Sequence, residues 1–543
     1  MSFSRVYSAQ THLLKGKIVT VEVDITPKTL HAFNVVGLPD KAVDESKDRM
    51  SSALKNSGYK SPKSKNQKIV ISLSPADLKK EGPYFDLAIA LAYLLSAEEI
   101  DFDPKGKIFL GELSLNGELQ PIKGVLPLTE QAMRLGFKEI FVPMVNAKEA
   151  ALVKGITIYG AKSLKEVIEH VSSAQGGSAS GGKIHYDRKG NPLEKERPKI
   201  LPQKPTEIIH KDIIHDLDFS DIRGQESAKR GLEIAAAGGH NIALSGPPGT
   251  GKTMLARVFS HILPALSNDD ILEITGIHSI VGLLEDTLVT EPPFRAPHHT
   301  ASYVSMIGGG SNPKPGEVTL AHKGVLFLDE FPEFEKRVLE ALRQPLEDNI
   351  VSISRARGSA IFPSNFILVA AMNPCPCGNK GNKDKVCICR PNDLERYARR
   401  ISGPIIDRID LWVTVGNVDY RKLGDEIVRS EKTHTIKARV KQARFIQEKR
   451  FANLEKPASA RGSGGRRIKT NSEMNVKDLG KMVKLTKEVR NLLDDSAEQL
   501  ALSARAYHRV IKIARTIADL ENSPNVEANH ILEAIQYRPK VNN

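Results

Sequence analysis

Cysteine is scarce in this chain and confined to one place. The 543 residues contain four cysteines, all of them between Cys375 and Cys389. A disulfide framework needs cysteines spread along the chain, so this distribution excludes one. Long apolar runs are also missing: the longest, residues 87–97, is shorter than the about 20 residues that cross a bilayer. Because the first residues also lack the apolar segment of a secretory signal, we expect a cytoplasmic protein with no membrane partner.

Charge of one sign is in excess. Lysine and arginine number 78 against 65 aspartate and glutamate residues, which gives a formal net charge of +13. With 40% hydrophobic and 26% charged residues, the composition is that of a globular protein and excludes wholesale disorder. At roughly 150 residues per domain, the length predicts three or four domains. The basic surplus permits nucleic acid as a partner.

Four segments of different character follow one another. Residues 1–172 mix strand-like alternation with helical stretches and predict one α/β unit. Residues 173–206 are rich in glycine and serine and then in lysine, arginine and proline, which is typical of a flexible linker. A second α/β pattern, assigned to residues 207–411, precedes a mostly helical segment over residues 412–543. The fold class is therefore α/β, with a helical C-terminal part.

A phosphate-binding loop is the most specific motif. Residues 241–245 form a short β-type run, the sequence Gly-Pro-Pro-Gly-Thr-Gly-Lys-Thr follows at 246–253, and a helical pattern comes next. Strand, glycine-rich loop and helix are the context that such a motif requires. Lys252 is expected to reach the β- and γ-phosphates of ATP, and the Thr253 hydroxyl to bind Mg²⁺. The expected ATP-binding residues of the loop are Gly246, Pro247, Pro248, Gly249, Thr250, Gly251, Lys252 and Thr253.

Two later strands end in polar residues that suit nucleotide hydrolysis. Residues 324–328 form an apolar run that ends in Asp329 and Glu330. Asp329 is expected to hold Mg²⁺ with its water shell, and Glu330 to activate the attacking water as a general base. Residues 366–371 form another apolar run, after which Asn373 could position that water. This last signal is weak alone, because Asn-Pro also begins turns.

Together these motifs resemble the AAA+ ATPases, specifically the magnesium-chelatase-like group and its bacterial competence-protein ComM (YifB) family. The resemblance covers nearly the whole chain outside the linker. It implies a P-loop AAA+ core with a parallel sheet, followed by a C-terminal helical lid. Besides the motifs above, the stretches that are similar to family signatures are residues 218–225, 293–302, 313–316, 342–347, 402–410 and 502–509.

The resemblance also implies roles for individual residues. Ile222 would lie near the adenine, and Asn373 would be the sensor 1 residue. Arg408 looks like the arginine finger that enters the neighbouring subunit's ATP, and Arg505 looks like the sensor 2 arginine of the lid. A guanidinium near the γ-phosphate stabilises the charge that spreads over its oxygens in the transition state. A finger supplied by a neighbour implies a homo-oligomeric ring, most simply a hexamer.

Residues 1–170 resemble the catalytic domain of Lon-type proteases, which has a ribosomal S5 domain 2-like fold. The similar stretches are residues 78–84 and 111–124. Those proteases use a serine nucleophile and a lysine, but Tyr84 and Leu128 occupy the matching positions in this chain. Neither side chain can do that chemistry. The expected domain is a degenerate protease fold that serves binding or assembly.

The four cysteines predict a metal site less firmly. Cys375 and Cys377 form one Cys-x-Cys pair, and Cys387 and Cys389 form another. A tetrahedral Zn²⁺ site would staple the loop after Asn373, although this spacing is tighter than the usual Cys-x₂-Cys. Free thiols and a reversible redox pair are the alternatives.

The expected substrate is DNA. Residues 351–362 have the alternation and the turn of a hairpin, and Arg355 and Arg357 at its tip would contact the phosphate backbone in the pore of a ring. The ComM resemblance implies ATP-driven branch migration of single-stranded or branched DNA during natural transformation. A magnesium-chelatase-like remodeller of a protein or metal-insertion partner, and a nucleotide-gated scaffold, are the alternatives. The adjacent His298 and His299 are interpreted as surface or packing residues rather than as metal ligands.

Overall fold

Two compact units make up the chain in the computed structural model. One contains Met1–Ile209 and Ile271–Val289, and the other contains His210–Asp270 and Thr290–Asn543. The predicted linker lies outside the described residues over 174–199, and the predicted domain boundaries stay predictions. The structure describes residues 3–173, 200–209, 215–284, 286–310, 313–355, 358–381, 385–416, 431–452 and 468–539.

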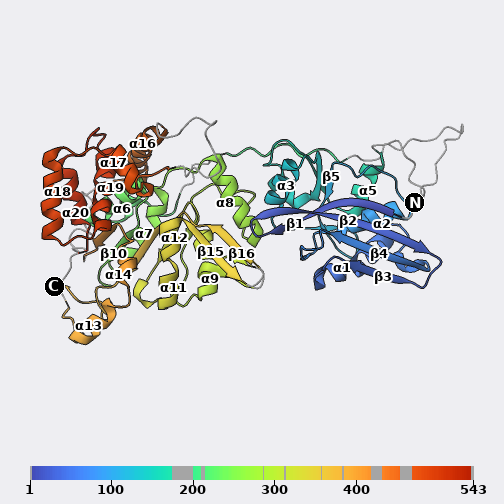
Figure 1. Ribbon diagram of the computed structural model, residues 1–543, viewed down its shortest axis with the longest axis horizontal. Helices are drawn as coiled ribbons and strands as arrows, with labels where there is room; N and C mark the ends of the chain where they lie inside the picture. The colour runs from blue at the N-terminus through green and yellow to red at the C-terminus, as the bar shows by residue number, and fades with distance from the viewer. Residues whose placement is uncertain are drawn as a thin grey trace. The chain divides into compact units, whose positions relative to one another are not determined.

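A four-stranded sheet organises the first part of the first unit (Figure 1). The alternation around Val19, Val21 and Val23 buries these three side chains completely, as the pattern predicts. Helix α1 (Lys41–Asn56) is capped by Asp40, whose side chain accepts a hydrogen bond from the Val43 amide. Helix α2 (Asp86–Ser96) is buried on nearly every side. In sheet order the strands are β1 (Phe3–His12), β2 (Lys15–Pro27), β4 (Gln67–Ser74) and β3 (Ala32–Val36), of which only β3 and β4 pair in parallel.

A smaller parallel sheet and a segment from later in the chain complete this unit. Helix α8 (Asn268–Val281) brings Ser279 into it, where the Ser279 Oγ donates to Glu149 Oε1 at 2.5 Å and accepts from the Gly124 amide at 2.9 Å. The segment that follows the phosphate-binding helix thus packs with the N-terminal unit. The strands are β5 (Lys107–Phe109), β8 (Glu139–Pro143) and β9 (Thr157–Ala161), with the hairpin β6 (Glu112–Leu113) and β7 (Leu119–Gln120), and the helices are α3 (Val125–Arg134), α4 (Ala147–Ala150) and α5 (Leu164–Ser173).

The second unit is built on a five-stranded sheet in which every pair of neighbours is parallel. Its three middle strands are apolar and buried on both faces, as expected for a parallel sheet. All three runs predicted as strands from the sequence are confirmed. In sheet order the strands are β11 (Phe294–Arg295), β14 (Val325–Leu328), β17 (Ile367–Met372), β10 (Ile242–Ser245) and β18 (Leu411–Thr414).

Helices cover this sheet, and several short elements extend from it. Helix α6 packs against β10, β18, α16 and α19. The predicted hairpin over residues 351–362 is confirmed as β15 and β16, which pair from Ile350 and Pro363 to Arg355 and Gly358. The elements are α6 (Glu226–Gly238), α7 (Lys252–His261), α9 (Tyr303–Ile307), β12 (Gly308–Gly309), β13 (Lys314–Pro315), α10 (Glu317–Leu320), α11 (Lys336–Ala341), α12 (Arg343–Asp348), β15 (Ile350–Arg355), β16 (Gly358–Pro363), α13 (Pro391–Ala398) and α14 (Gly403–Ile406).

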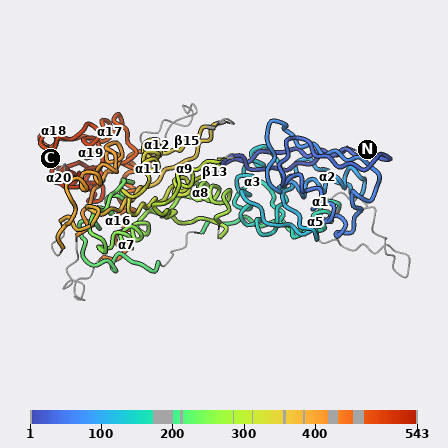
Figure 2. The backbone as a smooth tube through the Cα atoms, turned by 90° about the horizontal axis from the view of Figure 1, so that it is seen from below, coloured from blue at the N-terminus to red at the C-terminus, as the bar shows by residue number. Residues whose placement is uncertain are grey.

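The described residues after 430 are helical. Helices α18 and α20 lie side by side in both views (Figures 1 and 2). Strand β18 continues to Thr414, beyond the boundary predicted after residue 411. No helix among the described residues is long and apolar enough to cross a membrane. The helices are α16 (Thr433–Ala452), α17 (Val476–Met482), α18 (Lys487–Gln499), α19 (Ala504–Leu520) and α20 (Ala528–Gln536).

A buried carboxylate joins the sheet to helix α19. Asp410 forms an ion pair with Arg509, its Oδ2 lies 3.6 Å from His240 Nδ1, and it accepts a hydrogen bond from the Asn241 amide at 3.0 Å. Burial acts to raise the pKa of Asp410, but the Arg509 guanidinium, His240 and Lys512 together outweigh burial and hold the pKa below its usual range. The carboxyl group is therefore charged in the folded protein.

We expect Asp410→Asn to destabilise the second unit by about 3 kcal/mol, because it leaves the Arg509 guanidinium without its counter-charge. A carboxyl group with a lowered pKa stabilises the fold above its unfolded pKa of about 4 and loses that contribution as pH falls. The difference between wild type and variant should thus shrink below about pH 4. Denaturant unfolding at several pH values measures it, with the exposed Asp495→Asn as control. Equal stability of the two variants at neutral pH would contradict the prediction.

Candidate functional site

The glycine-rich loop joins β10 to the N-terminus of α7. Gly251 precedes the helix with a φ of +86°, a left-handed conformation that favours glycine. At the start of the loop, a Cβ on Gly246 would lie 2.1 Å from the carbonyl oxygen of Val415, so only glycine fits there. Helix α7 begins at Lys252, which directs its first backbone amides toward the loop. This arrangement is the one that cradles phosphate oxygens.

Lys252 holds the centre of the site. Its buried Nζ donates to the carbonyl oxygens of Gly246 at 2.7 Å and Pro247 at 2.8 Å, and to Asn373 Oδ1 at 3.2 Å. Burial lowers the pKa of the Lys252 ammonium, and the carboxylate of Asp329 acts in the opposite direction. The predicted lysine and the predicted sensor residue are therefore in direct contact.

The two predicted Mg²⁺ ligands also lie together. The exposed Thr253 Oγ1 donates to Asp329 Oδ2 at 3.0 Å. Oxygen ligands from one hydroxyl and one carboxylate, with room for water, suit Mg²⁺. The residues therefore fit the metal that the motif implies.

The order of the strands explains why these motifs meet. Strand β17, which ends before Asn373, pairs with β10 on one side and with β14 on the other. Because all three strands are parallel, their carboxyl ends share one edge of the sheet. Asn373 is thus placed between Lys252 and the two acidic residues Asp329 and Glu330.

His299 is a site residue that the sequence analysis missed. Its Nδ1 lies 3.0 Å from Oε2 of Glu330, the predicted general base. Residue Arg295 of β11 pairs with Leu326 of β14, so His299 and Glu330 each come four residues beyond paired positions. The neighbouring His298 contacts the Thr300 hydroxyl instead, at 2.9 Å from its Nδ1. The interpretation of His299 as a surface or packing residue is therefore incomplete, because its imidazole contacts the predicted general base.

The two predicted arginines share one carboxylate. Arg408 is buried and forms an ion pair with Glu347, and it also donates to the carbonyl oxygen of Pro404 at 2.8 Å. Arg505 is more exposed, and its Nη2 lies 3.6 Å from Glu347 Oε1. The structure brings these arginines together with each other. Among the contacts of the described residues, neither reaches Lys252.

Other predicted residues have simpler surroundings. Ile222, the predicted adenine neighbour, is buried in the hydrophobic core of the second unit. Arg355 ends strand β15, and the structure describes its backbone only; Arg357 lies outside the described residues. Tyr84, which the sequence analysis matched to the protease nucleophile, is half-buried, and burial raises its pKa.

The four cysteine sulfurs gather at one point. Their Sγ atoms all lie within 4.8 Å of one another, and none is in a disulfide. Cys375 is buried and the other three are partly exposed. The geometry brings together all four ligands that the sequence analysis predicted.

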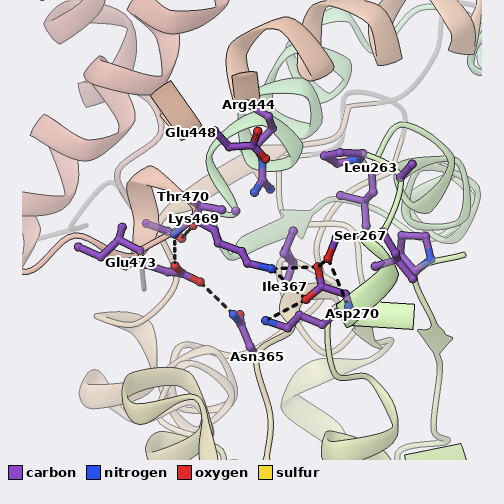
Figure 3. A pocket seen from close by; sticks show the side chains of 18 of the residues that line it. Leu263, Ser267, Asp270, Asn365, Ile367, Arg444, Glu448, Lys469, Thr470 and Glu473 are labelled. Atoms are coloured by element: carbon purple, nitrogen blue, oxygen red, sulfur yellow. Dashed lines mark hydrogen bonds and ion pairs between the residues drawn. The ribbon is translucent and has the colours of Figure 1, made fainter. Parts of the chain in front are cut away.

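A cavity of about 640 Å³ lies elsewhere in the second unit (Figure 3). It is lined by Gly324 and Ile367, at the amino ends of β14 and β17, which is the edge opposite the phosphate-binding loop. Several of its polar groups pair with one another: Lys469 Nζ lies 2.9 Å from Asp270 Oδ2, and Asn365 donates to Glu473 at 2.9 Å. None of the predicted site residues is among the described residues that line it.

Comparison with known proteins agrees with this geometry. Models of the magnesium chelatase subunit ChlI match residues 218–423 and 21–146, and a model of its C-terminal part matches residues 430–538. The chain is 40% identical over 541 residues to the uncharacterized protein YifB of Escherichia coli (strain K12), which covers 99% of this chain and 97% of that protein. It is 38% identical over 544 residues to the competence protein ComM of Haemophilus influenzae, covering 100% and 98%.

The chain belongs to the magnesium-chelatase-like AAA+ family that includes ComM and YifB. Membership implies ATPase activity with ATP and Mg²⁺. A more distant similarity, 22% identity over 372 residues, relates it to the DNA replication licensing factor Mcm6 of Drosophila melanogaster, with 64% of this chain and 40% of that protein covered.

We expect His299→Gln to lower kcat for ATP hydrolysis about fivefold with little change in KM, because the Glu330 carboxylate loses an imidazole contact, worth about 1 kcal/mol, that orients it. Steady-state ATPase assays measure both. His298→Gln is the matched control and should retain wild-type kcat. Equal losses in the two variants would contradict a positioning role for His299.

Proposed function

We propose that the chain is an ATP-driven ring motor, built as a hexamer, that moves along DNA and drives branch migration in natural transformation and recombination. The observation that carries the proposal is the separation of two groups of side chains in one chain. Lys252, Asp329 and Asn373 form one group at the phosphate-binding edge. Arg408 and Arg505 form another at Glu347. A complete hydrolytic site then requires two neighbouring copies.

In this proposal each group has a defined part in hydrolysis. The Lys252 ammonium binds the β- and γ-phosphates, and Mg²⁺ held by Thr253 and Asp329 would neutralise phosphate charge. Glu330 accepts a proton from the water that attacks the γ-phosphorus, and Asn373 orients that water. The neighbour's guanidiniums stabilise the charge on the transferred phosphoryl group.

Positive charge and the pore hairpin support DNA as the substrate. The chain carries a net charge of +13, and Arg355 is the last residue of β15 in the confirmed hairpin of β15 and β16. The relative from Haemophilus influenzae is named a competence protein, and the Drosophila relative a DNA replication factor. Hydrolysis would change the angle between the core and the C-terminal helices, which act as a lid, and the hairpins would then step along a strand.

We assign the N-terminal unit an S5 domain 2-like fold without peptidase activity. Its sheet and helices support this assignment, and the raised pKa of the half-buried Tyr84 phenol is unsuited to a nucleophile. The unit would bind partners or help the ring to assemble. Zn²⁺ is the metal we propose for the four cysteines.

The alternative function is a magnesium-chelatase-like remodeller of a protein or metal-insertion partner. It is favoured by the three family models, all of which describe subunit ChlI of magnesium chelatase. Such a motor would share the ATP site but not the response to DNA.

Subunit mixing tests the shared active site. Arg408→Ala and Lys252→Ala should each reduce ATP turnover by about 10³-fold or more, since each removes a phosphate-binding cation. Mixed in equal amounts before assembly, they should regain up to about a quarter of wild-type turnover, because one interface in four joins an intact Lys252 to an intact Arg408. An inactive mixture of correctly assembled rings would overturn the role of Arg408 in the neighbour's site.

A branch-migration assay tests the substrate. Wild-type protein with ATP should convert a synthetic four-way DNA junction into duplex products, and DNA should stimulate its ATPase activity. Lys252→Ala should do neither, because the phosphates lose their ammonium partner. An ATPase activity that no single-stranded, duplex or branched DNA changes would reject the DNA motor and favour the remodeller.

A further inference from the structure

The cysteine cluster has the dimensions of a tetrahedral zinc site. Sγ of Cys375 lies 3.4 Å from that of Cys377 and 3.7 Å from that of Cys387, and the Cys377–Cys387 separation is 3.6 Å. In a tetrahedron with Zn–S bonds of about 2.3 Å, the sulfurs are about 3.8 Å apart. A disulfide would instead require a separation of about 2.05 Å. The sulfurs therefore surround a point at the distance that Zn²⁺ requires.

Backbone amides point at these sulfurs. The amide of Lys380 donates to Cys375 Sγ at 3.3 Å, and the amide of Cys377 donates to Cys389 Sγ at 3.4 Å. Amide donors stabilise the thiolate form of cysteine and orient it toward a metal. Two of the four sulfurs, those of Cys375 and Cys389, thus accept backbone amide hydrogen bonds that favour the thiolate form.

This loop touches the nucleotide site at two places. Gly378, with a φ of +77°, packs on the phosphate-binding loop so closely that a Cβ there would lie 2.6 Å from Cδ of Pro248. After the second cysteine pair, helix α13 carries Tyr397, whose hydroxyl donates to the backbone carbonyl of Asn373 at 3.2 Å. The cysteine loop is therefore in contact with one end of the ATP cradle and tethered to the sensor residue.

We propose that Zn²⁺ bound to Cys375, Cys377, Cys387 and Cys389 is a structural brace that fixes Pro248 and Asn373 and thereby sets the affinity for ATP. This inference rests on the proposed function only in that the loop at 246–253 binds ATP. Four metal bonds would link residues 375–377 to residues 387–389 and restrain both segments together. Loss of the metal frees Gly378 from Pro248 and removes that restraint.

Two measurements that need neither DNA nor hydrolysis test the brace. Metal analysis of the purified full chain should find one Zn²⁺ per chain. The Cys387→Ser/Cys389→Ser variant should lose the metal and bind a fluorescent ATP analogue about tenfold more weakly. Val386→Ser, on a strongly exposed neighbour, is the matched control and should keep both properties. Absence of zinc from wild type, or unchanged nucleotide affinity after its loss, would overturn the proposal.

A second variant tests the contact with Pro248 while all four cysteine ligands remain in place. Gly378→Ala leaves all four ligands in place but inserts a methyl group against Pro248. It should retain zinc and still weaken nucleotide binding, whereas retention of both zinc and full affinity would contradict the contact that the brace requires. If the DNA-motor proposal fails, these binding results are unaffected, so the two failures are distinguishable.

Discussion

The buried ammonium of Lys252 is the interaction on which the second unit depends. It is held by two carbonyl oxygens of its own loop and by the side chain of Asn373. A buried cation needs such partners, because burial without them costs several kcal/mol. The same confinement makes the ammonium effective toward phosphate, since charges interact more strongly away from water. The sheet order that places β17 between β10 and β14 is therefore a requirement of the chemistry as well as of packing.

The carboxylate of Glu347 constrains the second group of site residues, Arg408 and Arg505. One carboxylate holds both Arg408 and Arg505, and Arg509 donates to the carbonyl of Arg408 while it pairs with Asp410. The backbone at Arg408 is thus fixed to helix α19, and its side chain is oriented by Glu347. If a neighbouring phosphate attracts the two guanidiniums, both move relative to one carboxylate. Their responses to nucleotide are then coupled through a single group.

A feature could be predicted where its residues form one continuous stretch of sequence, and not where they meet only in the folded chain. The phosphate-binding loop, the strand before Asp329 and the strand before Asn373 are contiguous motifs, and the structure confirms their strands. The contact of His299 with Glu330 depends on β11, which has only two residues and leaves no periodic pattern. Glu347 meets the arginines from a site more than 60 residues away in sequence, which spacing cannot show. Four cysteines within fifteen residues were recognisable, but their contact with Pro248 was not.

Most of helix α8 belongs to the N-terminal unit, although it lies far from that unit in sequence. Boundaries drawn along the sequence do not predict this. The chain passes between the two units after Ile209, after Asp270 and after Val289. Near the end of α8, Ser279 is anchored by Glu149 and by the Gly124 amide, and these bonds are buried. Removing a buried partner there would leave polar groups unsatisfied, which costs about 1–3 kcal/mol. The N-terminal unit is therefore attached to a segment that begins directly after the phosphate-binding helix, and a change at the ATP site has a covalent path to it.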